Sequence, residues 1–192
     1  MKKLLALVLA LVMSMSLVTI SNAAYSDAAD IDYTEAVDVM SAIGVLQGSD
    51  GKFNPDGILT RAEACTIITK ILGMADYVGT SSFADVKGHW GESAISFCAG
   101  EGIVNGTSAT TFDPNGICTR AQIVTFLWRA NGSPAVSGNS AFTDVAADAY
   151  YAAAVTWAEK NGVTGGIGGG LFGSGNNCTR AQIVTFIWRC KK

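Results

Sequence analysis

A four-residue motif recurs three times along this chain, and its spacing constrains the fold more than any other feature. Thr-Arg-Ala is followed by Glu or Gln at 60–63, 119–122 and 179–182, so the copies begin 59 and then 60 residues apart. Self-similarity at a fixed period indicates one supersecondary unit used repeatedly. A unit of about 55 residues buries little apolar surface alone, so we expect the three copies to pack on one another.

The first 23 residues have the pattern of a secretory signal peptide. Lys2 and Lys3 precede an apolar run over 4–18, and the small residues at 21 and 23 suit a signal peptidase. A membrane anchor is the alternative, but this run is shorter than the roughly 20 apolar residues that span a bilayer. We therefore expect the mature chain to begin at Ala24, to be exported, and to have no membrane insertion after cleavage.

The charge balance limits the class of partner. The whole chain has a formal net charge of −3, and loss of the two charges on Lys2 and Lys3 makes the mature part −5. No run of basic residues is present, which argues against nucleic acid and against bulk electrostatic binding to anionic lipid. An anionic ligand would instead need cations placed locally.

The cysteines form a poor disulfide framework for an exported chain, because their number is odd and none form Cys-x-x-Cys. Cys118 and Cys178 fall at the repeat position where the first copy has Leu59, which indicates small apolar core residues. We expect buried thiols in a low-oxygen host, with pairing of some cysteines as the alternative. The five are Cys65, Cys98, Cys118, Cys178 and Cys190.

Each copy reads as a helix, a polar turn and a second helix, most clearly in the second copy. There, an apolar face over 94–98 predicts a first helix that stops at the glycines of 100–102, and the second helix follows Thr119 and ends at 131–132. Phe53, Phe112 and Phe172 occupy equivalent places in the three turns. We assign the repeats to residues 24–75, 82–132 and 141–190, the first with a divergent start.

Two turn patterns invite other ligands. The glycine-rich turn 165–175 lacks the Lys-Ser end of a phosphate-binding loop, so a flexible loop is expected. The Asp and Asn residues at 50–57 and 113–116 lack the terminal Glu of a twelve-residue calcium loop and are ordinary turn formers. We expect neither a metal nor a cofactor.

The threonine and the Glu or Gln of the motif form the pattern of a helix capping box, so neither needs a ligand to account for its presence. The pairs are Thr60 with Glu63, Thr119 with Gln122, and Thr179 with Gln182. Each box satisfies free backbone N–H groups at a helix start and stabilises its helix by about 1 kcal/mol.

The arginine of the motif is not explained by capping. Arg61, Arg120 and Arg180 lie in the first helical turn, where a cation beside the positive end of the helix dipole costs a few tenths to about 1 kcal/mol. One explanation is pairing with an acid at a repeat opening, namely Asp27, Asp85 or Asp144. The other is that arginine and helix N-terminus together hold an external anion. The residues alone leave the two open.

The combined motifs resemble the S-layer homology family. The matching features are Phe-Ala-Asp-Val with Trp90, Gly-Ile-Val-Asn-Gly at 102–106, Thr-Phe-Asp-Pro-Asn-Gly at 111–116 and Thr-Arg-Ala-Gln at 119–122. The resemblance covers nearly all of 25–190. It implies an all-α domain of three helix–loop–helix repeats packed around a pseudo-threefold axis. It also implies non-covalent anchoring at the bacterial cell surface through an acidic, often pyruvylated, secondary cell-wall polysaccharide.

By this resemblance, Arg61, Arg120 and Arg180 would contribute to ligand grooves between the repeats. Copies two and three depart from the family pattern, because Gln122 and Gln182 stand where it usually has Glu, whereas Glu63 keeps the acid. The Gln residues remove a negative charge beside an arginine and join Glu63 as candidate ligand contacts. Trp90 is expected to be half-exposed, with a face that could stack on a sugar ring, whereas Trp157 is expected in the core.

No residues assemble a reaction centre. The single histidine, His89, is expected on the surface, and Glu92 and Glu101 look like solvated charges rather than an unequal carboxylate pair. We therefore expect a binding protein and not an enzyme. Because little sequence follows the third repeat before Lys192, the alternative is a self-assembling or adaptor protein of the envelope that tethers an envelope partner.

Overall fold

A computed structural model of the chain describes residues 25–27, 31 and 34–190, so the expected signal peptide lies outside the described residues. Across the described ranges the secondary structure is helical, with isolated β-bridges but no strand, which confirms the all-α prediction. No helix in these ranges is long and apolar enough to cross a membrane. The elements are α2 (Thr34–Ala42), α3 (Arg61–Ile71), the 3₁₀ helix η3 (Ala84–Val86), α4 (Glu92–Gly100), α5 (Arg120–Ala130), α6 (Ala152–Lys160) and α7 (Arg180–Arg189).

The second helix of each repeat begins where the capping box predicts. In α3, the Thr60 hydroxyl accepts the backbone N–H of Glu63 at 3.2 Å, and the Glu63 carboxylate accepts the N–H of Thr60 at 2.8 Å. Reciprocal hydrogen bonds of the same kind are present at the starts of α5 and α7. All three predicted boxes are confirmed, so these helix starts are fixed by local sequence.

Glycines end the first helices. Gly44, Gly102 and Gly162 follow α2, α4 and α6 with φ of 69°, 67° and 67°. Only glycine adopts this left-handed region without strain, so each helix stops and the chain turns towards its loop. The predicted end of α4 near 100–102 is confirmed.

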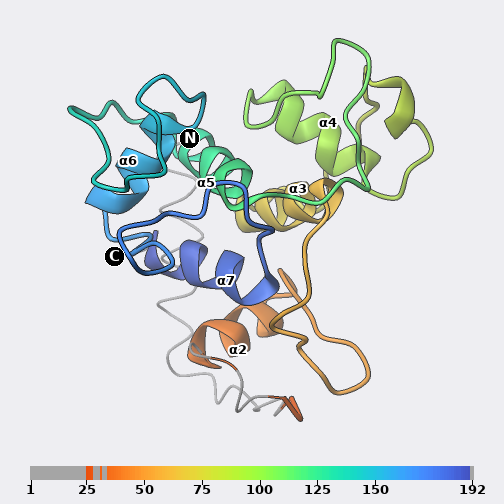
Figure 1. The fold of residues 1–192 in the computed structure, drawn as a ribbon. Helices are drawn as coiled ribbons and strands as arrows, with labels where there is room; N and C mark the ends of the chain where they lie inside the picture. The colour runs from red at the N-terminus through yellow and green to blue at the C-terminus, as the bar shows by residue number, and fades with distance from the viewer. Residues whose placement is uncertain (1–24, 28–30, 32–33, 191–192) are drawn as a thin grey trace.

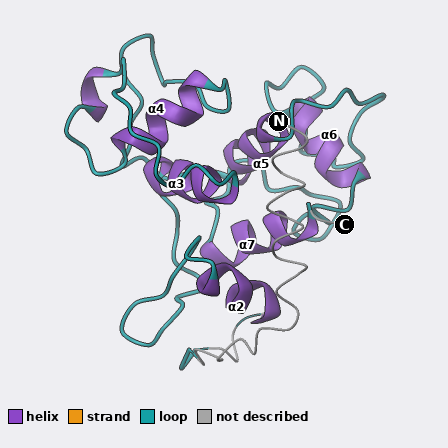
Figure 2. Cartoon of the chain, turned by 180° about the vertical axis from the view of Figure 1, so that it is seen from behind, coloured by secondary structure: helices purple, strands orange, loops and turns teal. Residues whose placement is uncertain are grey.

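The helices pair across repeat boundaries. The second helix of repeat one, α3, packs on α4 of repeat two, α5 packs on α6, and α7 of the last repeat packs on α2 of the first. Figures 1 and 2 show α3, α5 and α7 in the middle of the molecule, with α2, α4 and α6 at three corners. The packing unit is therefore offset from the sequence repeat, which leaves each copy unable to bury its helices alone.

Backbone hydrogen bonds close a ring through the residues that precede the capping boxes. Leu59 N donates to Cys178 O at 3.2 Å, Cys178 N to Cys118 O at 2.9 Å, and Cys118 N to Leu59 O at 2.8 Å. All three side chains are buried, as are Cys65 and Cys98. The expectation of buried thiols is confirmed for these four cysteines, and the ring ties each repeat to both others.

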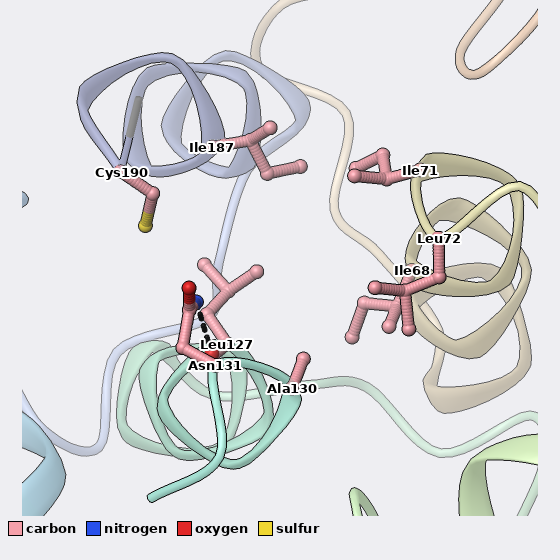
Figure 3. A pocket seen from close by; sticks show the side chains of 8 residues that line it. All are labelled: Ile68, Ile71, Leu72, Leu127, Ala130, Asn131, Ile187 and Cys190. Atoms are coloured by element: carbon pink, nitrogen blue, oxygen red, sulfur yellow. Dashed lines mark hydrogen bonds between the residues drawn. The ribbon is translucent and has the colours of Figure 1, made fainter. Parts of the chain in front are cut away.

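The core continues along the three central helices to their C-terminal ends. There α3, α5 and α7 converge on a small apolar cavity of about 40 Å³ (Figure 3). The Asn131 amide donates to Leu127 O at 2.8 Å, so its polar end is held at the rim. The lining residues are Ile68, Ile71, Leu72, Leu127, Ala130, Asn131, Ile187 and Cys190.

Candidate functional site

The helix N-termini that carry the arginines have no free N–H group for an external anion. Arg120 N donates to Asn176 O at 2.9 Å and Ala121 N to Ser174 O at 3.3 Å, both in the turn of the next repeat. The next N–H, of Gln122, donates to the Thr119 hydroxyl. The same pattern holds for α3, against Gly116 and Pro114, and for α7, against Gly57 and Pro55. The backbone N–H groups at all three helix starts are therefore already satisfied within the chain, which leaves the arginine side chains as the candidate anion contacts.

Each motif arginine reaches across a repeat boundary and donates to the carbonyl of a buried phenylalanine. Arg61 Nε donates to Phe112 O at 2.8 Å, Arg120 Nε to Phe172 O at 3.0 Å, and Arg180 Nε to Phe53 O at 2.9 Å. Each guanidinium also lies over the same phenylalanine ring, with its Cζ 4.2, 5.0 and 4.7 Å from the centroids. The arginines thus hold neighbouring repeats together through hydrogen bonds and cation–π contacts.

The aspartates at the repeat openings accept hydrogen bonds from backbone N–H groups of the same phenylalanine segments. The Asp144 carboxylate accepts Phe172 N at 2.7 Å and Gly173 N at 2.8 Å. Asp85 binds Phe112 N and Asp27 binds Phe53 N in the same way. Among the described residues, no salt bridge joins these aspartates to the arginines. Direct Arg–Asp pairing, one of the two explanations that the residues left open, is therefore replaced by a shared clamp on one backbone segment.

One of the three guanidinium groups is left incomplete. Arg61 Nη2 donates to Asn105 O at 2.8 Å and Arg180 Nη2 to Gln47 O at 2.8 Å. The corresponding Nη2 of Arg120 is buried and has no hydrogen-bond partner within the described chain. The Arg120 side chain is only 2% exposed, and burial lowers its pKa from the ordinary value. An orphaned donor on a buried cation costs stability unless a ligand satisfies it.

Arg120 lies at a groove formed with the third repeat. The groove has a volume of about 480 Å³, in the range of small-ligand sites. Arg120 and Arg189 supply cationic groups, and no Asp or Glu belongs to the lining. The other lining residues are Thr164, Gly166, Ile167, Gln182, Thr185 and Phe186.

The match to known proteins agrees with this architecture. The family model for the S-layer homology domain matches residues 24–65, 82–124 and 141–184, more than half of the chain. The chain belongs to the S-layer homology family. This match confirms the resemblance inferred from the repeated motifs.

Several relatives of this S-layer homology chain are surface proteins. It is 41% identical over 95 residues to the surface-layer 125 kDa protein of Lysinibacillus sphaericus, covering 48% of this chain and 8% of that protein. It is 30% identical over 181 residues to cell surface glycoprotein 1 of Acetivibrio thermocellus, and this match covers 83% of this chain and 8% of that protein. It is 31% identical over 177 residues to the amylopullulanase of Thermoanaerobacterium thermosulfurigenes, and this match covers 85% of this chain and 9% of that protein. The chain spans about a tenth of the length of these relatives.

The family and the surface-layer relatives support an exported location at the cell surface or in the cell wall. They also indicate a surface-anchoring domain, and two of the relatives that it matches are named as an exoglucanase and an amylopullulanase. Within this S-layer homology domain, Glu92 is partly exposed, and its carboxylate also accepts backbone hydrogen bonds that the sequence did not indicate. It accepts Gly88 N at 2.8 Å and Ser81 N at 3.2 Å, and these hydrogen bonds hold its pKa below the ordinary range.

Two of the residues at the Glu or Gln position of the motif, Glu63 and Gln182, are capping groups that also lie near an arginine of another repeat. Gln182 lines the groove with Arg120. The carboxylate of Glu63 acts on Arg180, where its negative charge opposes the fall in pKa caused by burial of the guanidinium. The acid of the first repeat therefore partly balances the arginine of the third. At the Arg120 groove, the corresponding residue Gln182 is neutral, so the opposing negative charge on Arg120 comes from Asp144 and not from the cap of α7.

The aromatic candidates separate into core and surface residues. Trp157 is buried, as expected, whereas Trp90 is 65% exposed, more than expected. Trp90 lies near the start of α3, since a Cβ added to its neighbour Gly91 would come within 3.1 Å of Ala62. Tyr150 stands at the corresponding place before α6 and is 64% exposed, a surface aromatic that the sequence analysis did not select. His89 contacts the Trp90 ring and lies near the Asn115 amide, at 3.3 Å.

Three polar residues of the groove lie outside the repeated motif and were not predicted from the sequence. Thr164 lies in the loop after α6, whereas Thr185 and Arg189 lie on α7. Gln182, Thr185, Phe186 and Arg189 follow an i, i+3, i+4, i+7 pattern, which places them on one helix face. That periodicity was available in the sequence once Gln182 was a candidate. In the described ranges, no group of three or more His, Cys, Asp or Glu residues could hold a metal ion.

Proposed function

We propose that this chain anchors non-covalently at the bacterial cell surface by binding an acidic secondary cell-wall polysaccharide, and that the groove beside Arg120 is its principal binding site. The carrying observation is a groove that Arg120 and Arg189 line without any acid, together with the buried Nη2 of Arg120, which has no hydrogen-bond partner in the described part of the chain. A carboxylate of the glycan in this groove would balance the charge of Arg120, and a shift of the Arg120 side chain towards the groove would let Nη2 donate to it.

The rest of the groove fits a sugar that carries such a carboxylate. Thr164, Thr185 and Gln182 offer hydroxyl and amide groups to sugar hydroxyls, and Ile167 with Phe186 offers an apolar surface. This mixture would accept a pyruvate ketal, which joins a carboxylate to a methyl group. Sites of a few polar groups set in apolar walls are typical for small-ligand recognition.

The other candidate residues have smaller parts in this proposal. Arg61 and Arg180 mainly join the repeats, because both their Nε and Nη2 groups already donate to protein carbonyls. Gln122 and Glu63 cap α5 and α3 and remain candidate rim contacts in the boundaries beside these arginines. Trp90 contributes an exposed ring for stacking on a sugar.

We also infer that the three repeats are arranged around a pseudo-threefold axis. The closed ring from Leu59 to Cys178 to Cys118 supports this, as do the three equivalent arginine–phenylalanine contacts. Under such an arrangement the three boundaries would be alike in backbone and differ in side chains. The difference at Arg120 is then a property of this sequence rather than of the fold.

A matched pair of substitutions tests the groove. Gln182→Glu places a carboxylate beside Arg120, and Gln122→Glu places the same group at the equivalent boundary. Both should keep the cap, because Glu63 caps α3 with the same geometry. We expect Gln182→Glu to weaken sedimentation with intact wall sacculi about 10-fold, by like-charge repulsion of the ligand. Gln122→Glu should bind within about 2-fold of the parent chain.

Walls stripped of their polymer by acid separate the ligand from the site. The parent chain should sediment with intact walls and remain in solution with stripped ones. Equal binding of the parent to both would reject the polysaccharide, and equal binding of parent and Gln182→Glu to intact walls would reject the Arg120 groove. Ordered sheets formed without any wall material would favour the self-assembling envelope protein instead.

A further inference from the structure

Two cysteines meet across the boundary between the first and second repeats. Cys65 lies on α3 and Cys98 on α4, the two helices that pack on each other there. Both side chains are fully buried. The Cys98 sulfur lies 3.6 Å from the carbonyl oxygen of Cys65 and 3.5 Å from the hydroxyl of Thr69, one helical turn further along α3.

The other two helix pairs have no cysteine at these places. The motif aligns Cys65 with Val124 and Val184, and the helix-ending glycines Gly44, Gly102 and Gly162 align Cys98 with Met40 and Ala158. All four of these are buried. Apolar residues thus fill the position adequately elsewhere, and cysteine occurs on both sides of one boundary only. This coincidence is not explained by packing.

The local environment makes one of the two thiols the better nucleophile. Hydrogen bonding between the thiols raises the pKa of Cys65 well above its ordinary value, with burial acting in the same direction. The same hydrogen bond, helped by Thr69 and opposed by burial, lowers the pKa of Cys98. Thiolates are the reactive form in exchange with disulfides, so Cys98 is the attacking residue.

The remaining cysteines are less suited to this chemistry. Burial raises the pKa of Cys118, Cys178 and Cys190 to about 12 each. Cys118 and Cys178 also belong to the backbone ring, where their peptide groups are already joined by a hydrogen bond of 2.9 Å. Their burial matches that of Leu59 at the equivalent place, which is the pattern of a core residue.

We propose that Cys65 and Cys98 form a reversible disulfide that covalently fastens the first repeat to the second when the exported chain meets a small-molecule disulfide. This inference does not depend on the proposed glycan ligand. The bond would join α3, which begins with Arg61, to α4, and so reinforce the boundary that the Arg61–Phe112 contacts already hold.

The chemistry balances as two thiol–disulfide exchanges. The Cys98 thiolate attacks one sulfur of the small disulfide, forms a mixed disulfide and releases one small thiolate, which takes up the proton that Cys98 lost. Cys65 then loses its proton, attacks the Cys98 sulfur and releases the second small thiol. The protein loses two hydrogen atoms, and the small disulfide is reduced to two thiols. Because both sulfurs are buried, we expect exchange during folding or local opening rather than in the closed structure.

Peptide mapping tests the pairing directly. The chain is unfolded in urea with reductant, refolded in a buffer of oxidised and reduced glutathione, alkylated, and digested without reduction. We expect a loss of about 2 Da and a linked peptide pair containing Cys65 and Cys98. We also expect a rise of about 1 M in the urea midpoint, reversed by reductant.

Variants taken from the other repeats serve as controls. Cys98→Ala reproduces the residue of repeat three and should abolish the 2 Da loss and the midpoint rise, and Cys65→Val should do the same. Cys118→Ala should retain the linked peptide, provided that circular dichroism shows a folded chain. A link between Cys118 and Cys178, a link between two chains, or fully alkylated Cys65 and Cys98 after refolding would each overturn the proposal.

Discussion

Arg120 donates to the carbonyl of Phe172 at 3.0 Å while its guanidinium lies 5.0 Å from the centre of the same residue's ring. On the other side of that peptide segment, Asp144 accepts the N–H of Phe172 at 2.7 Å. A cation of one repeat and an anion of the next therefore act on one phenylalanine without forming an ion pair with each other. The motif arginine is first a structural residue, and its use in binding depends on what remains unsatisfied.

Because the motif arginines hold the repeats together, replacing two of them with alanine should lower the free energy of unfolding by unequal amounts. Arg61→Ala removes hydrogen bonds to Phe112 O and Asn105 O and should destabilise the chain by about 3 kcal/mol. Arg120→Ala removes one such bond together with an orphaned donor, so about 2 kcal/mol is expected. Urea denaturation at neutral pH measures both. A larger cost for Arg120→Ala would contradict the assignment of Nη2 as unpartnered.

The hydrogen bonds of Asp144 predict that the stability of the fold depends on pH. Although desolvation raises the pKa of Asp144, the N–H groups of Phe172 and Gly173 outweigh it and hold that pKa below the ordinary value. A carboxyl with a depressed folded-state pKa stabilises the fold above its unfolded pKa of about 3.9, and this contribution is lost as pH falls through the folded pKa.

The substitution Asp144→Asn should therefore lower the urea midpoint at pH 7 but have little effect near pH 2. The exposed Asp148→Asn removes an equal charge from the same repeat and serves as the control. We expect the gap between parent and Asp144→Asn to narrow as acid is added, whereas the control should follow the parent throughout. A gap that stays constant with pH would show that the carboxylate charge is not what stabilises the turn.

The parts of this molecule that sequence predicts well are those fixed by near neighbours. Thr119 and Gln122 are three residues apart, so their capping box and the start of α5 can be read directly. Gly102 ends α4 for an equally local reason. These rules place the helices but say nothing about which helix faces which.

The site was harder to predict because its contacts are distant in sequence. The carbonyl partners of Arg61, Arg120 and Arg180 lie 51, 52 and 127 residues away. A backbone carbonyl leaves no mark on the side-chain sequence, so pairing with an acid or an external anion were the visible alternatives. The use of each helix N-terminus by the next repeat's turn was hidden for the same reason.

Alanine substitutions at two glycines of the second repeat should change the stability of the chain in opposite directions. Gly100 is the last residue of α4 and an added Cβ would meet nothing within 4 Å, so Gly100→Ala should stabilise by about 0.5–1 kcal/mol. At Gly106, a Cβ would come within 2.5 Å of both the Phe83 ring and Thr111 O. Gly106→Ala should therefore destabilise by about 2 kcal/mol. Thermal melts compare the two, and a neutral Gly106→Ala would mean that this turn does not pack against Phe83.

The difference among the three boundaries predicts the binding stoichiometry. Arg61 and Arg180 already use both Nε and Nη2, whereas Arg120 uses Nε but not Nη2. A purified acidic wall-polymer fragment of one repeating unit should therefore bind one per chain. Isothermal titration calorimetry measures this number directly. Gln182→Glu should lower the affinity of this single event about 10-fold, and Gln122→Glu should leave both number and affinity unchanged. Three equivalent binding events would show instead that the family motif, rather than the unsatisfied donor of Arg120, decides where the glycan binds.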